Sequence, residues 1–354
     1  MRVNRAQYLA RVCALLLGLG VFVPAPLLGA PQTKPSATKK STASKKKPTY
    51  SANSSARRKA RLARARAAAR AREQARLRQL RALQEAMTPR FKADETGAMV
   101  PDVRAAAAII FNPETGEVLW EENGQDKRPI ASITKVMTAL VFLEDNPDLT
   151  QQITIARSDV YAASTTYLRA NERISVNDLL HLALVASDNA AARALARISH
   201  GGSAAFIERM NEKALELGLE STTFADPSGL NPENISSAYD LSRLISLASA
   251  DDRIAPIMRT AEYKISTSRR KFSIHSTNRL LLGGEVDVMG GKTGFISKAG
   301  YCLATLLRLP QSNHQVAVVV LGATSNQGRF WETRHLFNWL SQKAADIFTK
   351  DQQQ

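Results

Sequence analysis

Ala105-Ala-Ala-Ala-Ile-Ile-Phe111, Asn112-Pro-Glu-Thr-Gly116 and Glu117-Val-Leu-Trp-Glu121 follow one another and decide the fold class. An apolar run, a turn with Pro and Gly, and a second run with Val and Trp predict a β-hairpin. Strand-like sequence returns only near the other end of the chain, at residues 263–268, 271–276, 286–293, 300–308 and 315–322. The residues between are helical in pattern, and 328–350 predicts a final helix. Strands at both ends with helices inserted between them predict an antiparallel sheet sandwiched by helices.

The net charge of +16 belongs to the beginning of the chain. Residues 31–90 hold 18 Lys and Arg against Glu73 and Glu85, and residues 1–30 add three Arg. The remaining residues carry 27 basic and 30 acidic side chains. The predicted domain is therefore slightly acidic, and its balanced charge supplies no patch for binding nucleic acid.

Residues 1–30 have the organisation of an export signal peptide. A start with three Arg precedes an apolar run at 12–23, and small residues with Pro follow it. Cleavage is expected after Ala25 or Ala30. An uncleaved membrane anchor is the less favoured alternative, because the apolar run is short for a helix that spans a bilayer. The expected location is the periplasm.

Cysteine and histidine residues predict neither a metal site nor a catalytic triad. Cys13 lies at the start of the apolar run and not after it, so it is not placed for lipid attachment, and removal of the signal would leave Cys302 alone. A single cysteine excludes an intramolecular disulfide and a cysteine-bound metal. The five histidines are scattered and no Gly-x-Ser-x-Gly motif accompanies them. No metal and no other cofactor is expected.

A basic arm is predicted between the signal and the domain. Residues 31–55 are Lys, Ser, Thr, Ala and Pro, a composition that favours disorder. Residues 56–92 begin with Arg/Ala-rich sequence without a helix breaker to residue 87, which predicts a helix with Arg on all sides. A short seam near its end is a candidate docking point on the domain: Leu77, Leu80, Leu83 and Met87. A solvated spacer is the preferred interpretation, and binding to an anionic membrane or wall polymer is the alternative. The folded domain is expected over 93–354.

The first chemical motif is Ser132-Ile-Thr-Lys135, at the start of a helical apolar stretch that runs to residue 143. Residues three apart on a helix lie on one side, so a hydroxyl and an amine come within reach of each other. A serine is activated this way only if Lys135 is neutral. Burial would lower its pKa, and a second ammonium nearby, for which Lys292 is the candidate, would lower the pKa further. The motif alone is weak evidence, because Ser at a helix N-cap followed by Lys in the next turn is common in helices of any function.

The second motif is Ser187-Asp188-Asn189, between two helical stretches. In an extended loop, residues two apart project together, so Ser187 and Asn189 are expected in the cleft while Asp188 faces the scaffold. Ser187 could relay a proton between Lys135 and a leaving amine, and Asn189 offers a donor and an acceptor to a peptide substrate. The alternative for this motif alone is a simple helix N-cap.

The third motif is Lys292-Thr293-Gly294, followed by Phe295, on a strand with flanking glycines. Glycines let another backbone approach, as when a substrate adds along a sheet edge. Lys292 and Thr293 supply a cation and a hydroxyl suited to a carboxylate. The backbone N–H groups of Ser132 and Phe295 would then form an oxyanion hole.

These three motifs, in this order, resemble those of penicillin-binding proteins and serine β-lactamases. Two further stretches, Phe224-Ala-Asp-Pro-Ser-Gly-Leu230 and Lys292-Thr-Gly-Phe-Ile-Ser-Lys-Ala-Gly300, resemble the D-alanyl-D-alanine carboxypeptidase/endopeptidase family of low-molecular-weight penicillin-binding proteins (peptidase S11). The resemblance covers about residues 105–340. It implies a β-lactamase/transpeptidase-like α/β fold, with a five-stranded antiparallel sheet, flanking helices and an all-helical lobe. It also implies cleavage of D-alanyl peptide bonds in peptidoglycan and acylation by β-lactams.

Within that family, the short form of the chain after its last helix is most similar to the endopeptidase branch, the penicillin-binding protein 7 type. The resemblance implies Ser132 as nucleophile, Lys135 as base and Ser187 as relay. It implies substrate binding by Asn189, Lys292, Thr293 and Gly294. Cleavage of the D-Ala crosslink and release of terminal D-Ala both stay open.

Two alternative functions deserve a test. A class A-like serine β-lactamase needs a placed carboxylate to release its acyl group quickly. The acids after the second motif recur every four residues, which is typical of a solvated helix face: Glu208, Glu212, Glu216 and Glu220. A non-catalytic cell-wall-binding protein would keep the fold and lose the motifs, whereas all three motifs are intact.

Overall fold

The computed structural model describes residues 52–310 and 314–351. The predicted signal at 1–30 and most of the predicted linker at 31–55 lie outside the described residues. The chain divides into two compact units, Met1–Ala69 and Arg70–Gln354, and the boundary falls inside helix α2 (Ala52–Met87). This helix begins inside the stretch predicted to be linker. None of the helices that the structure describes combines the length with the hydropathy of a membrane-spanning segment.

Helix α2 is solvated along its described side chains. From residue 56 to 87 every side chain is exposed except Ala86, which is half-buried. The seam predicted to dock on the domain is therefore exposed as well. Arg104 binds the carbonyl end of the helix: its guanidinium donates to Glu85 O at 2.7 Å and to Thr88 O at 3.3 Å. A cation at a helix C-terminus satisfies carbonyls that have no partner within the helix.

The central sheet joins the first hairpin to three strands from the end of the chain. Its strand order is β11-β12-β13-β3-β4, and every neighbouring pair is antiparallel. The strands are β3 (Ala107–Phe111), β4 (Val118–Glu122), β11 (Asp287–Ile296), β12 (Gly300–Arg308) and β13 (Gln315–Ala323). The predicted five-stranded antiparallel sheet is confirmed. Strand β11, which carries the third motif, lies at one edge.

The remaining strands form small separate pairs, all antiparallel. The two strands predicted after residue 262 pair with each other and not with the central sheet: β9 (Glu262–Ser266) and β10 (Lys271–His275). The other pairs are β1 (Phe91–Ala93) with β2 (Met99–Pro101), β5 (Arg128–Pro129) with β8 (Ile235–Ser236), and β6 (Gln152–Thr154) with β7 (Arg173–Ser175).

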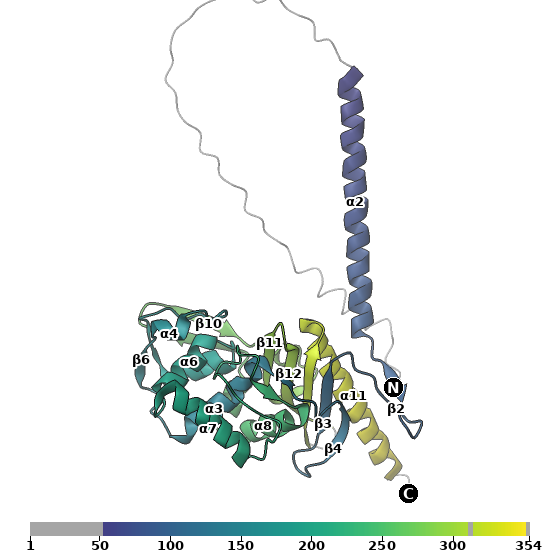
Figure 1. Ribbon diagram of the computed structural model, residues 1–354. Helices are drawn as coiled ribbons and strands as arrows, with labels where there is room; N and C mark the ends of the chain where they lie inside the picture. Colours follow the sequence, from purple (N-terminus) through teal and green to yellow (C-terminus); the bar gives the residue numbers. More distant parts are fainter. Residues whose placement is uncertain (1–51, 311–313, 352–354) are drawn as a thin grey trace, which may run out of the picture. The chain divides into compact units, whose positions relative to one another are not determined.

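Most helices lie between β4 and β11 in sequence, as the helical pattern predicted. They are η1 (Ala131–Ile133), α3 (Thr134–Glu144), α4 (Arg157–Val160), α5 (Val176–Leu184), α6 (Asn189–Ile198), α7 (Gly202–Glu216), α8 (Ala238–Ala250), α9 (Ala255–Met258) and α10 (Leu280–Gly283). Helix α11 (Asn326–Asp351) follows β13 and packs on the sheet, where Figure 1 draws it in yellow.

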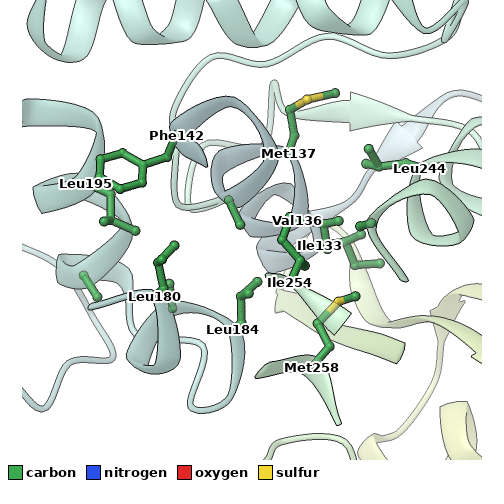
Figure 2. Packing of buried hydrophobic residues seen from close by; sticks show 14 of the residues in the cluster. Ile133, Val136, Met137, Phe142, Leu180, Leu184, Leu195, Leu244, Ile254 and Met258 are labelled. Carbon is green, nitrogen blue, oxygen red and sulfur yellow. The ribbon is translucent and has the colours of Figure 1, made fainter. Parts of the chain in front are cut away.

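The sheet has an apolar core on each face. Side chains alternate along β3, so Ile109 joins the larger core, with the helical lobe and α8, while Ile110 joins the smaller core under α11. Helix α3 lies inside the larger core, since nine of its eleven residues are buried. Figure 2 shows side chains of α5, α6, α8 and α9 gathered around it. Burial of both faces of α3 places its first turn, with Lys135, in the interior.

Candidate active site

Ser132 is held at the entry to the buried helix. It is the middle residue of η1, which leads directly into α3, as the first motif predicted. Ala131 before it has φ +50°, in the left-handed region that non-glycine residues seldom adopt. The Thr134 hydroxyl donates to Ala131 O at 2.8 Å and holds this turn. A costly backbone conformation next to the hydroxyl is typical of a functional site.

Lys135 is completely buried and points at Ser132. Its Nζ lies 2.9 Å from Ser132 Oγ, 2.7 Å from Asn189 Oδ1 and 2.5 Å from Ser228 O. Burial lowers the pKa of Lys135 to about 7, with Asp188 and Asp226 opposing the shift and Arg193 adding to it. A large fraction of Lys135 is therefore neutral at physiological pH, the state in which an amine can take a proton from a hydroxyl.

The second motif forms a sharp turn between α5 and α6. Ser187 has φ +60°. Asp188 is buried and faces the scaffold as predicted, accepting from Tyr167 N at 2.6 Å and from Ala191 N at 2.9 Å, where it caps α6. Burial raises the pKa of Asp188, and these backbone donors oppose the rise.

Asn189 is 4% exposed and both atoms of its amide have protein partners. Its Nδ2 donates to Ala163 O at 2.8 Å, which directs Oδ1 toward Lys135. Asn189, which was predicted to bind the substrate peptide, thus uses its amide oxygen to accept a hydrogen bond from Lys135.

Lys292 is hydrogen-bonded to the second motif and not to Lys135. Its Nζ donates to Ser187 Oγ at 2.8 Å and to Thr293 O at 3.0 Å. The pKa of Lys292 is well below its ordinary value because of burial first, and then because of the charges of Lys135 and Arg329. Lys292 was predicted as the second cation beside Lys135, and the repulsion between these two lysines is one cause of the lowered pKa of Lys292. Arg193, which was not predicted, contributes to the lowered pKa of Lys135.

Gly294 lets the edge strand pack on the turn that carries Ser132. A Cβ at this position would lie 2.6 Å from Ile130 O and 3.3 Å from Ser132 N. The backbone that this glycine admits is therefore η1 of the same chain, and the contact brings the Ser132 amide close to the residue before Phe295. Phe295 itself is 49% exposed, with its ring stacked on Tyr301 at 4.3 Å.

The structure brings all three motifs together. Lys135 and Asn189 are hydrogen-bonded across 54 residues of sequence, and Ser187 and Lys292 across 105. It also adds a group that we did not predict, the main-chain carbonyl of Ser228. Residues 224–230 entered the sequence argument only through a family resemblance, because a carbonyl is present in every residue and leaves no signal in the sequence. The glycine at 229, which has φ +84° in the structure, is a signal in the sequence that could have indicated a special turn there.

Gly229→Ala should disrupt the site. A Cβ at Gly229 would lie 2.0 Å from Ala131 O and 2.8 Å from Ser132 N, both backbone atoms. We expect loss of penicillin labelling and a decrease in the unfolding free energy of more than about 2 kcal/mol, measured by denaturant titration. Gly97→Ala is the matched control, because Gly97 has φ +83° with nothing within 4 Å of an added Cβ. Equal destabilisation by both substitutions would contradict the importance of the contact.

Known proteins resemble this chain in sequence. The family model described as D-alanyl-D-alanine carboxypeptidase, peptidase S11, matches residues 94–325. The D-alanyl-D-alanine endopeptidase of Escherichia coli (strain K12) is 34% identical over 252 residues, covering 70% of this chain and 81% of that protein. The D-alanyl-D-alanine endopeptidase of Haemophilus influenzae is 36% identical, covering 64% and 78%.

Solved structures share the fold. The crystal structure of the Streptomyces K15 DD-transpeptidase is 28% identical, with a TM-score of 0.63, and the match covers 68% of this chain and 98% of that one. The predicted α/β transpeptidase-like fold is thereby confirmed. The matched family region contains all three motifs and the Ser228 loop, so the chain belongs to the peptidase S11 family of D-alanyl-D-alanine carboxypeptidases.

Proposed function

We propose that this protein is a serine DD-peptidase that hydrolyses D-alanyl bonds of peptidoglycan through an acyl-enzyme on Ser132. The observation that carries the proposal is the 2.9 Å contact between Ser132 Oγ and the buried amine of Lys135, whose pKa burial lowers to about 7. An amine neutral at working pH and in hydrogen-bond contact with a hydroxyl is the arrangement that activates a serine without histidine.

Acylation begins when neutral Lys135 takes the hydroxyl proton as Ser132 Oγ attacks the D-alanyl carbonyl carbon. The developing oxyanion is assigned to the backbone N–H groups of Ser132 and Phe295. Their closeness is supported by the packing of Gly294 on η1. Collapse of the tetrahedral species breaks the C–N bond, and water later releases the acyl group and restores Ser132.

The proton that Lys135 takes up must reach the leaving amine, and we assign this transfer to Ser187. Its hydroxyl would give its own proton to the leaving amine and take the proton of Lys135 in exchange, which returns Lys135 to the neutral state. Ser187 Oγ accepts from Lys292 Nζ at 2.8 Å, a bond that holds the hydroxyl in the site. We assign the substrate carboxylate to Lys292 and Thr293, as the cation–hydroxyl pair predicted. Asn189 holds Lys135, and its second amide hydrogen remains for the peptide.

Among the described residues, the side-chain partner of Ser132 is Lys135, and no carboxylate is hydrogen-bonded to this serine as the β-lactamase alternative would favour. The four glutamates considered for that role are all exposed: Glu208, Glu212, Glu216 and Glu220. Asp188 and Asp226 lie closer to Lys135, but their oxygens accept backbone N–H groups. Slow release of the acyl group is therefore expected, and repeated rapid turnover of nitrocefin would favour a β-lactamase.

The substrate test uses purified protein with two defined substrates, pentapeptide monomers and crosslinked muropeptide dimers. We propose preferential cleavage of the crosslink, since relatives named endopeptidase are matched over 78–81% of their length. Monomers appearing from dimers without release of D-Ala would support this preference. Release of D-Ala from pentapeptides with dimers left intact would assign the enzyme to carboxypeptidases. If neither product forms, the non-catalytic cell-wall-binding function is the alternative that remains.

The location and the arm complete the proposal. The periplasm contains the substrate of a DD-peptidase. Export to this compartment is inferred from the signal-like sequence of residues 1–30. Helix α2 exposes basic side chains along its length, which supports contact with an anionic surface or a role as solvated spacer. Sedimentation of the full mature chain with phosphatidylglycerol vesicles, lost at high salt, would support the surface contact. No binding at low salt would leave the spacer.

A further inference from the structure

The three hydrogen-bond partners of Lys135 differ in what they can do. The Asn189 amide oxygen and the Ser228 carbonyl only accept, whereas the Ser132 hydroxyl can donate. A neutral amine has two hydrogens and one lone pair. When the hydrogens go to Asn189 Oδ1 and Ser228 O, the lone pair is left facing Ser132. The Ser228 carbonyl therefore helps to decide whether Lys135 can act as a base.

The direction of that carbonyl is set by a carboxylate on the other side of the loop. Gly229 N donates to Asp226 Oδ1 at 2.6 Å. Ser228 C=O and Gly229 N–H belong to one planar trans peptide, in which the two groups point in opposite directions. Because the N–H points to Asp226, the carbonyl points away from it, to Lys135.

Asp226 accepts further hydrogen bonds from the same loop. Its Oδ1 also accepts from Ser228 N at 2.5 Å and from Ser228 Oγ at 2.9 Å, and its Oδ2 accepts from Asn231 N. Charge-assisted bonds of this kind are stronger than neutral ones. A single carboxylate thus accepts from four donors of the loop around the carbonyl.

The loop is also joined to the helix that carries Lys135. Thr138 Oγ1 donates to Pro227 O at 2.6 Å, and Asn234 Nδ2 donates to both Thr134 Oγ1 at 3.0 Å and Asp226 O at 2.9 Å. Loop and helix therefore keep one relative position.

We propose that Asp226 is a positioning residue for the reaction: its carboxylate holds the Ser228 carbonyl on Lys135, so that the lone pair of the amine faces Ser132. This inference rests on the proposed function, since it presumes acylation of Ser132. Asp226 also acts through charge, as one of the groups that oppose the lowering of the Lys135 pKa. The other charged groups facing the amine are Asp188 and Arg193 from the α6 side and Lys292 from β11.

Two variants separate the hydrogen bonds from the charge. Asp226→Asn keeps an oxygen for the N–H of Gly229 and removes the charge, so its acylation plateau should stay within about threefold of the wild type. Asp226→Ala removes both, and misorientation of the amine should lower the plateau about tenfold to a hundredfold. In both, loss of a negative charge favours the neutral amine, so the acidic limb of the pH–rate profile should move to lower pH.

The experiment measures the rate of penicillin acylation of the full mature chain from pH 5 to 9, with the Ser132 adduct identified by mass spectrometry. Asp240→Asn is the control. Asp240 is buried, and like Asp226 it accepts from a backbone N–H and a hydroxyl, those of Ser221 and Thr222, but it is not among the charges acting on Lys135. It should lower the melting temperature and leave the limb in place.

An unchanged plateau in Asp226→Ala would overturn the positioning role. If Asp226→Ala does not fold, Asp226→Ser, which lacks the δ oxygens that accept the Gly229 N–H, takes its place. An acidic limb that stays at the wild-type pH in Asp226→Asn would overturn the contribution of the Asp226 charge. A wild-type protein without an adduct on Ser132 would instead overturn the proposed function itself, so the two failures are distinguishable.

Discussion

Ser132→Ala should abolish acylation by penicillin and lower turnover of D-alanyl substrates by a factor on the order of 10⁴ or more. The substitution removes the atom that forms the covalent bond, and among the described residues Ser132 Oγ is the hydroxyl in contact with the buried amine. The measurement is mass spectrometry of the intact protein after penicillin treatment. The variant should show no added mass, while the wild type gains one acyl group.

The fold should survive this change, because removing one hydroxyl at the surface of the site leaves the packing of α3 intact. Ser246→Ala is a suitable control, since its hydroxyl is part-buried on α8 and donates to Ser242 O at 2.7 Å, away from the motifs. It should label like the wild type. An adduct that persists in Ser132→Ala would show that another residue is the nucleophile.

Lys135→Met should lower the acylation rate by about 10² to 10⁴, the range expected for loss of a general base. Methionine keeps the length and apolar contacts of the side chain but supplies neither a lone pair for the Ser132 proton nor donors for Asn189 Oδ1 and Ser228 O. Stopped-flow measurement of acylation gives the rate. Lys213→Met is the control and should leave the rate unchanged. Lys213 lies on α7 and forms ion pairs with Glu144 of α3 and Glu216 of α7.

The pH profile gives Lys135 a second signature. Only the neutral amine takes a proton, so the acylation rate of the wild type should rise with pH through about 7. Folding lowers the pKa of Lys135 from 10.5, so between these values the unfolded chain binds more protons than the folded one. The unfolding free energy should therefore rise with pH over this window, and Lys135→Met should flatten that rise. A wild-type rate independent of pH from 5 to 9 would contradict the role of Lys135 as base.

Sequence reasoning was strongest where local pattern and chemistry coincide. The hairpin at residues 105–121, the late strands and the helix at Ser132 were predicted from apolar periodicity, and the structure has them within a few residues. Asp188 was predicted to face the scaffold from its position between Ser187 and Asn189, and it is buried. Such features depend on neighbours along the chain, which the sequence displays directly.

Pairings between distant segments were less accessible. The strands at Glu262–Ser266 and Lys271–His275 could not be separated from the central sheet by pattern, because an apolar–polar alternation does not name its partner strand. Ser187 was predicted to relay a proton from Lys135, and its hydrogen bond with Lys292 was not predicted. This bond depends on how β11 lies against the turn, which is a property of packing.

By itself the sequence determined the chemistry: a serine, two lysines and their companions in an order that one family uses, on a chain whose domain is built from an early hairpin, a helical insertion and late strands. Only the tertiary structure decided which lysine is bonded to Ser132, how far burial lowers its pKa, and that Asp226 directs the Ser228 carbonyl to it. The physical reason is that burial and the direction of a backbone carbonyl arise from contacts between segments about 90 residues apart. No residue type records them.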